Sequence, residues 1–408
     1  MSSKIDDLPW KNWAGNISAT PQQIVRPVSE AEVAALVQKA TRTGQPVRVV
    51  GSGHSFQPLC ATDGLLISLD DLQGVVSADS ASGLATVWAG TKLHALGAPL
   101  LEAGLALENM GDIDRQSVAG AISTGTHGTG PTLRNLSSQV VSLRLVTAAG
   151  EVVELSADSH PPLFKAAQVS LGSLGVITQA ILRCLPTYHL HERTWAEPFA
   201  DCMARLDERI SATRHFEFFW VPGEDVAACK ALRPVETESW QVAENPPGLS
   251  ERLRRYIGPE RVDWSYRIFP SERNNRFVEM EFAVPAADGP ACMQEIRALM
   301  QARHPQVQWP VEYRTLAADD LWLSPAYQRE SVTISIHQAA DLPYADFFAD
   351  AEAVFRSYRG RPHWGKLHSH TAADFAELYP RWDDFLAVRR ELDPDDRFLN
   401  DHLRRIVE

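Results

Sequence analysis

The chain has 408 residues, of which 44% are hydrophobic and 22% are charged. It can therefore bury a large core and is long enough for two or three domains. The 39 Lys and Arg residues against 52 Asp and Glu residues give a formal net charge of −13. This balance argues against a nucleic-acid-binding protein and against a polybasic membrane-surface protein, and it favours a small or neutral partner.

The five cysteines are odd in number and widely spaced, and no two of them have the spacing of a C-x-x-C motif or another metal-ligand pair. They are typical of buried thiols in a reducing compartment. Residues 1–13 include acidic residues and no apolar signal region, and no apolar run approaches the roughly 20 residues that a membrane-spanning helix needs. We expect a soluble, cytoplasmic protein that binds neither nucleic acid nor a membrane, as a monomer or a weak homo-oligomer.

The first 186 residues mix helices and strands. Ser29 and Glu32 form a capping box at the start of a predicted helix that ends at Gly44. The β-branched run 47–50 predicts a strand that leads directly into a glycine-rich loop. Further expected elements are strands at 65–69, 86–89 and 176–185, a helix from Thr91 with Leu93, Leu96 and Leu100 facing inward, and a hairpin over 141–155.

The composition changes after Pro186, where aromatic residues become more frequent and glycines become fewer. Alternating apolar side chains over 216–220 and 278–284 predict antiparallel strands with one buried face. Helices are expected over 288–302 and 344–358. This region is therefore predicted to be an antiparallel sheet covered on one side by helices.

Two polar glycine loops in the first region have the composition of an anion-binding site. Gly51, Ser52 and Gly53 follow a strand, and glycine lets backbone N–H groups approach a phosphate closely. The third glycine of the dinucleotide fingerprint is missing, which argues against a nicotinamide enzyme. From spacing alone, His54 is better explained as a histidine satisfied by hydrogen bonds in a tight loop. Residues 111–130 place hydroxyl groups beside glycines, and two such loops indicate a large polyanionic cofactor.

These motifs carry a resemblance to a known family. VVGSGHSF at 49–56 and SVAGAISTGTHGTG at 117–130 resemble the FAD-binding domain of the vanillyl-alcohol oxidase family, within it the aldonolactone oxidases and the alditol oxidases. Further matches follow in order along nearly the whole chain: NWAGN at 12–16, SLGSLGVIT at 170–178, FEFFW at 216–220, LSPAY at 323–327 and RPHWGK at 361–366.

The resemblance implies an α+β fold. A two-subdomain PCMH-type FAD-binding domain is expected at 1–186, followed at 187–360 by a substrate-binding α/β cap domain, in which helices cover an antiparallel sheet. A C-terminal segment at 361–408 is expected to return to the FAD domain.

The resemblance also implies the cofactor, FAD, covalently attached through His54 at the flavin 8α-methyl group. Asp112 stands where alditol oxidases have a serine that touches both flavin and substrate. The adjacent Gly111 is small and would leave space for oxygen beside the flavin, which favours an oxidase. The residues expected to line the FAD are Gly51, Ser52, Gly53, His54, Ser55, Asp112, Ser117, Gly120, Ser123, Thr124, Thr126, His127, Ile177 and Lys366.

Two predicted strands of the second region carry polar residues at a period of two. Glu312 and Arg314 share one face of the first strand, and Ser335 and His337 share the polar face of the second. If both faces line one cavity, they form a polar wall suited to sugar hydroxyls. Two solvent-facing surfaces with an ordinary ion pair fit the same pattern. His337 is the candidate general base, because histidine titrates near neutral pH.

Lys366 resembles the family's active-site lysine. A fixed cation there would stabilise the negative charge that develops at flavin N1 and C2=O when hydride reaches N5. The ordinary alternative is a solvated surface lysine. His368 and His370 have an H-x-H spacing, but no cysteine or H-E-x-x-H pattern accompanies them, so no metal site is expected.

Together these features predict an FAD-dependent oxidoreductase that oxidises a CH–OH group of a small sugar derivative by hydride transfer to flavin N5, with reoxidation by O2. Lys366, Glu312, Arg314 and His337 are the expected catalytic residues. An aldono-1,4-lactone such as L-gulono- or D-arabinono-1,4-lactone is the expected substrate, because FEFFW, VEYR and Asp112 favour lactones. The alternatives are an alditol oxidase of the xylitol or sorbitol type and a lactone dehydrogenase with another acceptor. A non-catalytic sugar-binding protein is expected to lack His54 or Lys366.

Overall fold

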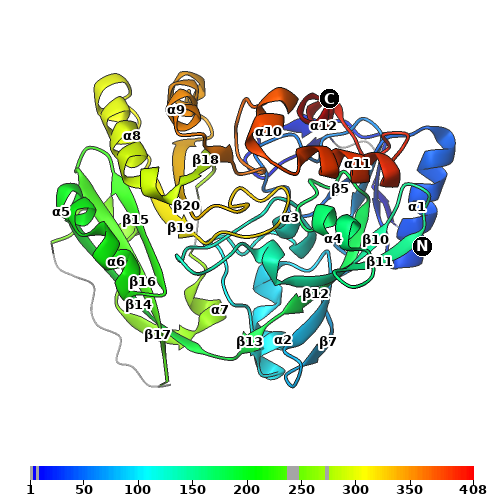
Figure 1. Ribbon diagram of the computed structural model, residues 1–408, viewed down its shortest axis with the longest axis horizontal. Coiled ribbons are helices and arrows are strands. Elements are labelled where there is room, and N and C mark those ends of the chain that lie inside the picture. The colour runs from blue at the N-terminus through cyan, green and yellow to red at the C-terminus, as the bar shows by residue number, and fades with distance from the viewer. Residues whose placement is uncertain (1–2, 6–8, 237–247, 272–274) are drawn as a thin grey trace.

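The computed structural model describes residues 3–5, 9–236, 248–271 and 275–408. Its strands form three main sheets, and helices pack against each of them (Figure 1). A search of these described ranges finds no helix with the length and apolar character that crossing a membrane requires.

The first sheet contains the strand that precedes the first glycine loop. Its strands are ordered β1 (Ser3–Ile5), β4 (Gln23–Arg26), β6 (Leu65–Ser68) and β5 (Val47–Val50), and β4, β6 and β5 run parallel. Helix α1 (Glu30–Thr43) begins and ends as predicted, because the Ser29 side chain accepts from the N–H of Glu32 and Gly44 closes the helix at φ +72°. In the predicted capping box the Glu32 carboxylate would accept from the N–H of Ser29. In the structure it accepts from the N–H of Val28, one residue earlier.

The second sheet is antiparallel throughout. Its order is β11 (Val152–Ser156), β10 (Val140–Val146), β12 (Val176–Arg183), β8 (Leu84–Trp88) and β7 (Val75–Asp79).

The single helix predicted from Thr91 is wrong: a 3-10 turn at Leu93–Ala95 precedes a separate helix, α2 (Gly97–Glu102). Pro99 explains the break, because it has no N–H to donate to the preceding turn. The other elements of this half are α3 (Val118–Ser123), α4 (Pro161–Ala167) and the paired strands β2 (Trp10–Lys11) with β3 (Ser18–Ala19) and β9 (Leu105–Ala106) with β13 (Leu185–Pro186).

The third sheet has eight antiparallel strands. Their order is β17 (Arg261–Trp264), β14 (His189–Pro198), β16 (Val226–Val235), β15 (His215–Val221), β19 (Val311–Leu316), β20 (Ser331–Ala339), β18 (Phe277–Pro285) and β21 (Arg361–Pro362). One face packs on the helices α5 (Phe199–Ala204), α6 (Leu206–Ala212), α8 (Gly289–Arg303) and α9 (Ala345–Ser357) (Figure 1). The two helices predicted for this region are confirmed as α8 and α9, and the short α7 (Ser265–Ile268) follows β17.

The opposite face of the third sheet is polar and buried. The register pairs Glu312 with Ser335, Arg314 with Thr333 and Glu279 with His337, so these side chains share one face. Glu312 and Arg314 are only 5% and 8% exposed. The alternative of two solvent-facing strand surfaces is therefore wrong.

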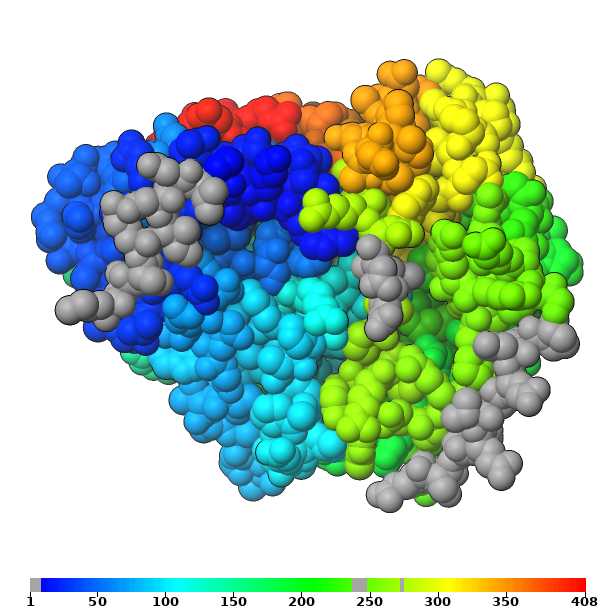
Figure 2. Space-filling view, turned by 180° about the vertical axis from the view of Figure 1, so that it is seen from behind, coloured from blue at the N-terminus to red at the C-terminus, as the bar shows by residue number. Residues whose placement is uncertain are grey.

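The end of the chain packs against its beginning. Helices α10 (Ala372–Leu378), α11 (Trp382–Leu392) and α12 (Asp401–Val407) share a hydrophobic core with the first two sheets. Arg397 O accepts a hydrogen bond from Val47 N–H, and buried Arg48 donates to carbonyls of Leu59, Leu171 and Gly172 and to that of Phe398. Figure 2 shows the molecule from behind, where the red C-terminal segment lies along the blue N-terminal one. These contacts hold the loop after β5 between both ends of the chain.

Candidate active site

A cavity lies where the polar face of the third sheet meets the glycine loops. It encloses about 950 Å³ of space between atoms, part of it open to solvent. Its polar lining comes from three regions: His54, Ser55, Asp112, Gln116, Thr124, Thr126 and His127 from the loops; Glu279, Glu281, Glu312, Arg314 and His337 from the sheet; and His363 and Lys366 after β21. The structure thus brings all four expected catalytic residues into one cavity with the expected flavin-attachment histidine.

The NWAGN segment supports the first glycine loop. Trp13 N–H donates to Gly53 O at 2.7 Å, the Asn12 side chain donates to Ser55 O at 3.0 Å, and the Trp13 ring stacks on His54 with ring centroids 5.1 Å apart. From the other side, Gly365 O accepts from Phe56 N–H at 2.7 Å. The NWAGN and RPHWGK segments therefore hold the loop that contains His54 in place, although the three segments are far apart in sequence.

Burial lowers the pKa of His54 to about 4, and the nearby Lys366, Lys92 and Arg115 cations act in the same direction. At neutral pH the ring is uncharged, so one ring nitrogen retains an available lone pair.

The two glycine loops touch each other. A Cβ on Gly51 would lie 2.0 Å from the Ser117 Oγ, so only glycine permits this approach. Ser117 caps α3 by accepting from Gly120 N–H, and Thr124 donates to Gly120 O. These backbone cradles and hydroxyl groups fit the phosphates and polar edges of FAD.

The expected FAD-lining residues divide into two groups. His54, Ser55, Asp112, Thr124, Thr126, His127 and Lys366 line the cavity, whereas Gly51, Ser52, Gly53, Ser117, Gly120, Ser123 and Ile177 lie outside its lining. Gly51 and Ser117 of this second group lie where the two loops meet, and Ile177 lies in β12. A cofactor with a ring in the cavity and phosphates between the loops would contact both groups.

Gly111 has a different role from the one that the sequence suggests. A Cβ there would lie 2.9 Å from His127 O, so the glycine is required by close backbone packing. The position where a side chain would stand is occupied by that carbonyl, not by open space. Its smallness is therefore no argument for oxygen access.

Glu281 is the centre of a buried hydrogen-bond network. Its carboxylate accepts from the His127 Nε2 at 2.8 Å, from Ser335 Oγ at 2.6 Å and from the Arg314 guanidinium at 2.5 Å. Burial alone would raise the pKa of Glu281, but His127 and the Arg314 guanidinium outweigh it and hold that pKa well below the usual range.

His127 faces acceptors on both sides. Its Nδ1 lies 2.7 Å from Gly128 O, and its Nε2 contacts the ionised Glu281. Both partners are therefore oxygen acceptors for the ring. The second glycine loop is held to the third sheet by this contact between side chains at most 2% exposed.

Lys366 is paired rather than solvated. Its Nζ donates to the Glu279 carboxylate and lies 5.2 Å from the centre of the Phe56 ring, and its side chain is 18% exposed. Burial raises the pKa of Glu279, but Lys366 and His337 more than compensate, so the carboxyl group is ionised. The surface-lysine alternative is wrong.

His337 is oriented by the backbone. Its Nδ1 lies 2.9 Å from Pro310 O and donates to it, which leaves Nε2 as the nitrogen that can accept a proton. That Nε2 lies 3.7 Å from Glu279 Oε1. The backbone thus fixes the ring, with Nδ1 on Pro310 and Nε2 toward Glu279.

Glu312 behaves differently from its two neighbouring glutamates. Burial is the main cause that raises the pKa of Glu312 to about 8. The Arg314 cation, 3.3 Å away, lowers this pKa, whereas the negative charges of Glu217, Asp112 and Glu279 raise it further. Arg314 lies closer to Glu281, at 2.5 Å, so it compensates Glu312 less. Glu312 is consequently protonated at neutral pH and can donate a hydrogen bond into the cavity.

Asp112 connects the second glycine loop to the third sheet. Its carboxylate lies 3.1 Å from Lys230 Nζ, which also contacts Glu217 at 3.1 Å, and it accepts from Ser271 Oγ at 3.0 Å. The Lys230 ammonium and the Ser271 hydroxyl therefore fix the Asp112 carboxylate in place.

Several of these residues were not predicted from the sequence: Glu217, Lys230, Glu279, Glu281 and His363. A signal existed for two of them, because the run FVEMEF over 277–282 alternates and places Glu279 and Glu281 on the face opposite Val278, Met280 and Phe282. His363 accepts from Gly365 N–H, and burial lowers its pKa to about 3, so it is neutral.

Comparison with known proteins matches the chain to two family models. The model described as D-arabinono-1,4-lactone oxidase matches residues 180–257 and 242–406, and the one described as FAD binding domain matches residues 21–156. The two matches divide the chain in the same order as the sheets described above.

Curated relatives cover nearly the whole chain. It is 42% identical to the L-gulono-1,4-lactone dehydrogenase of Mycobacterium tuberculosis over 98% of this chain and 99% of that protein. It is 32% identical to the L-gulonolactone oxidase of Bos taurus over 98% of both chains.

Solved structures share the fold. A solvent-stable cholesterol oxidase superposes with a TM-score of 0.84 at 19% identity over 98% of both chains. Cholesterol oxidase from Brevibacterium sterolicum gives 0.84 at 15% identity over 100% of this chain and 97% of that one. These likenesses confirm the fold class predicted from the sequence.

Proposed function

Because the chain belongs to the D-arabinono-1,4-lactone oxidase family and contains its FAD-binding domain, it is an FAD-dependent oxidoreductase, and we propose that it oxidises a CH–OH group of an aldono-1,4-lactone. L-gulono-1,4-lactone and D-arabinono-1,4-lactone are the proposed substrates. The observation that carries this proposal is the convergence of Lys366, Arg314, Glu312 and His337 in one cavity beside the His54 loop.

In this proposal residues 1–186 and 361–408 hold FAD, and residues 187–360 hold the substrate. FAD, when bound, supplies the two-electron acceptor for the hydride. Arg314 and the protonated Glu312 bind and orient the polar groups of the lactone, and His337 takes the hydroxyl proton at Nε2. Lys366 provides positive charge for the cofactor as it becomes reduced.

Anaerobic stopped-flow mixing tests the substrate. We expect both lactones to bleach the flavin absorbance at least about tenfold faster than xylitol or sorbitol, because in this proposal Arg314 and the protonated Glu312 bind and orient the polar groups of the lactone. Faster bleaching by the alditols would transfer the assignment to an alditol oxidase.

Admission of air after bleaching then tests the acceptor. Rapid return of colour supports the proposed use of O2. A lactone dehydrogenase remains a second candidate because Gly111 provides no open space and because the 42% identical relative is named a dehydrogenase. Slow return of colour in air, with rapid return on adding an artificial acceptor, would favour it.

We further propose that FAD is joined covalently to His54. The proposal is supported by the uncharged, partly enclosed ring at the cavity wall and by its fixed position against Trp13. Acid precipitation of the wild-type protein is expected to give a yellow pellet, and a tryptic peptide containing residue 54 is expected to carry the mass of FAD. His54→Ala should release all flavin on precipitation, whereas His94→Ala, outside the cavity lining, should retain it. A colourless wild-type pellet contradicts the covalent bond.

Glu312 should produce an alkaline limb in the pH profile. Its pKa is raised to about 8, so the carboxyl group is protonated below that pH and ionised above it. If the protonated form binds the lactone, kcat/KM should fall roughly tenfold between pH 7 and pH 9. Glu312→Gln, which stays neutral, should retain activity at pH 7 and lose this limb. An unchanged limb in the variant would assign the titration to another group.

A further inference from the structure

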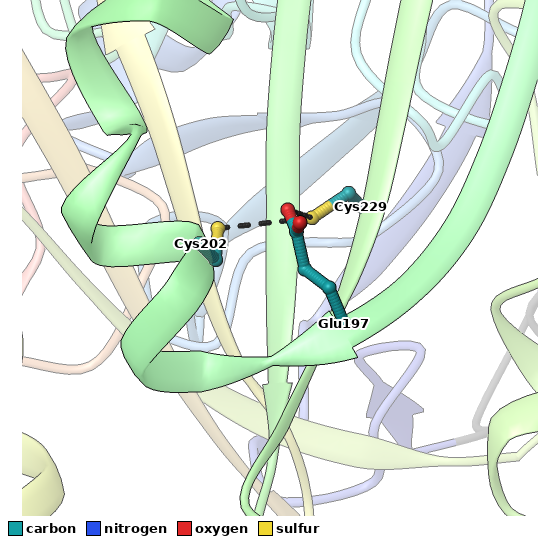
Figure 3. Close-up of side chains that lie close together, drawn as sticks. All are labelled: Glu197, Cys202 and Cys229. Carbon is teal, nitrogen blue, oxygen red and sulfur yellow. Dashed lines mark hydrogen bonds between the residues drawn. The ribbon is translucent and has the colours of Figure 1, made fainter.

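Three potential metal ligands meet on the helix-covered face of the third sheet. Figure 3 shows Glu197 of β14, Cys202 of α5 and Cys229 of β16 with their side chains pointing toward one another. Lys230, the next residue in β16, reaches Asp112 near the cavity. Because neighbouring strand residues point to opposite faces, Cys229 lies on the far side of the sheet from the proposed active site.

Two separations between the donor atoms match edges of a zinc coordination tetrahedron. The two Sγ atoms are 3.7 Å apart, and Cys229 Sγ lies 3.4 Å from Glu197 Oε1. All three ligand atoms lie within 4.8 Å of one another. Zn–S bonds of about 2.3 Å and Zn–O bonds of about 2.1 Å at tetrahedral angles require S–S and S–O separations of about 3.8 and 3.6 Å.

The charges also balance. Two thiolates and one carboxylate carry three negative charges, which a divalent ion reduces to one. Arg209 lies 2.5 Å from the other oxygen of Glu197 and neutralises the remainder. The Arg209 guanidinium is itself stacked over the Trp195 ring at 5.0 Å, so it is held as an outer partner of the carboxylate.

Access and burial suit a tightly held ion. Cys202 and Cys229 are 0% and 1% exposed, so the sulfur ligands are shielded from water. The Glu197 and Arg209 side chains are 14% and 20% exposed, which leaves a route to the site from that side.

We propose that Glu197, Cys202 and Cys229 bind one Zn²⁺ ion, with water as a fourth ligand. The ion would connect α5 to strands β14 and β16 and stabilise this end of the sheet. Binding replaces the two S–H bonds by two Zn–S bonds and releases two protons, with no change of oxidation state.

Cobalt titration of the flavin-loaded protein tests the site. After chelator treatment under reducing conditions, Co²⁺ should bind with one equivalent and produce the red-region absorption of tetrahedral thiolate coordination, which lies beyond the flavin spectrum. One equivalent of Zn²⁺ should displace it. Cys202→Ser and Cys229→Ser should abolish the absorption, and Cys292→Ser, which removes a buried free thiol outside the cluster, should leave it unchanged. Retained flavin absorbance and lactone oxidation would show that each variant is folded.

A second measurement needs no variant. Bound Zn²⁺ should protect Cys202 and Cys229 of the wild-type protein from alkylation in mild urea, while Cys292 reacts at the same rate with and without the ion. The proposal is overturned if the wild type gives no cobalt absorption, if Cys202→Ser binds cobalt equally well, or if peptide mapping finds a Cys202–Cys229 disulfide in the isolated protein. Because the cobalt, alkylation and disulfide readouts do not depend on the substrate, they stand apart from the proposed function, and retained flavin absorbance alone is enough to show that a variant is folded.

Discussion

Replacing Lys366 with methionine is expected to slow flavin reduction by a lactone roughly 10²- to 10³-fold, the range measured when one fixed electrostatic donor is removed from an active site. Lys366 is a cation in the cavity wall, held by Glu279. Its loss removes positive charge where negative charge develops during hydride transfer. The measurement is the limiting rate of anaerobic flavin bleaching at saturating lactone.

Two control variants distinguish loss of the Lys366 charge from destabilisation of the protein. Lys366→Met leaves Glu279 without its closest cation, so the double variant Lys366→Met/Glu279→Gln removes the unpaired charge as well. We expect the double variant to remain slow. Lys165→Met, which breaks a pair with the exposed Asp320, should bleach at the wild-type rate. A Lys366→Met enzyme that bleaches as fast as the wild type would refute the proposed role.

Glu281→Gln is expected to lower the free energy of unfolding by about 3–5 kcal/mol, the usual effect of breaking a buried ion pair. The carboxylate is the shared acceptor of Arg314, His127 and Ser335, and the substitution leaves the buried Arg314 cation without it. Urea-induced unfolding followed by tryptophan fluorescence measures the change.

The pH dependence of this effect has a defined sign. The folded-state pKa of Glu281 lies well below the usual 4.5, so its contribution is fully present above that pH and is lost as the pH falls through the folded-state pKa. The difference between wild type and variant should therefore shrink in acid. Glu260→Gln is the matched surface control, because Glu260 is one-third exposed and pairs with His191 and Arg193. It should change stability by at most about 1 kcal/mol; an equal loss in both variants would contradict the network.

The sequence by itself determined the local elements and the family. The cap of α1, the glycine loops and the helices α8 and α9 follow from short-range patterns, and the alternation in β19 and β20 already placed Glu312 with Arg314 and Ser335 with His337 on common faces. Lys366 and His54 were found through motifs that extend along the chain.

Only the tertiary structure decided which charges meet. Glu279 and Glu281 are separated from Lys366 and His127 by 87 and 154 residues, and Cys202 and Cys229 are 27 residues apart with no ligand spacing between them. It also showed that Gly111 is required by the His127 carbonyl and leaves no open space. The physical reason is that a period of two assigns a side chain to a face of its own strand, whereas strand order and register, set by burial of the whole sheet, select its neighbours.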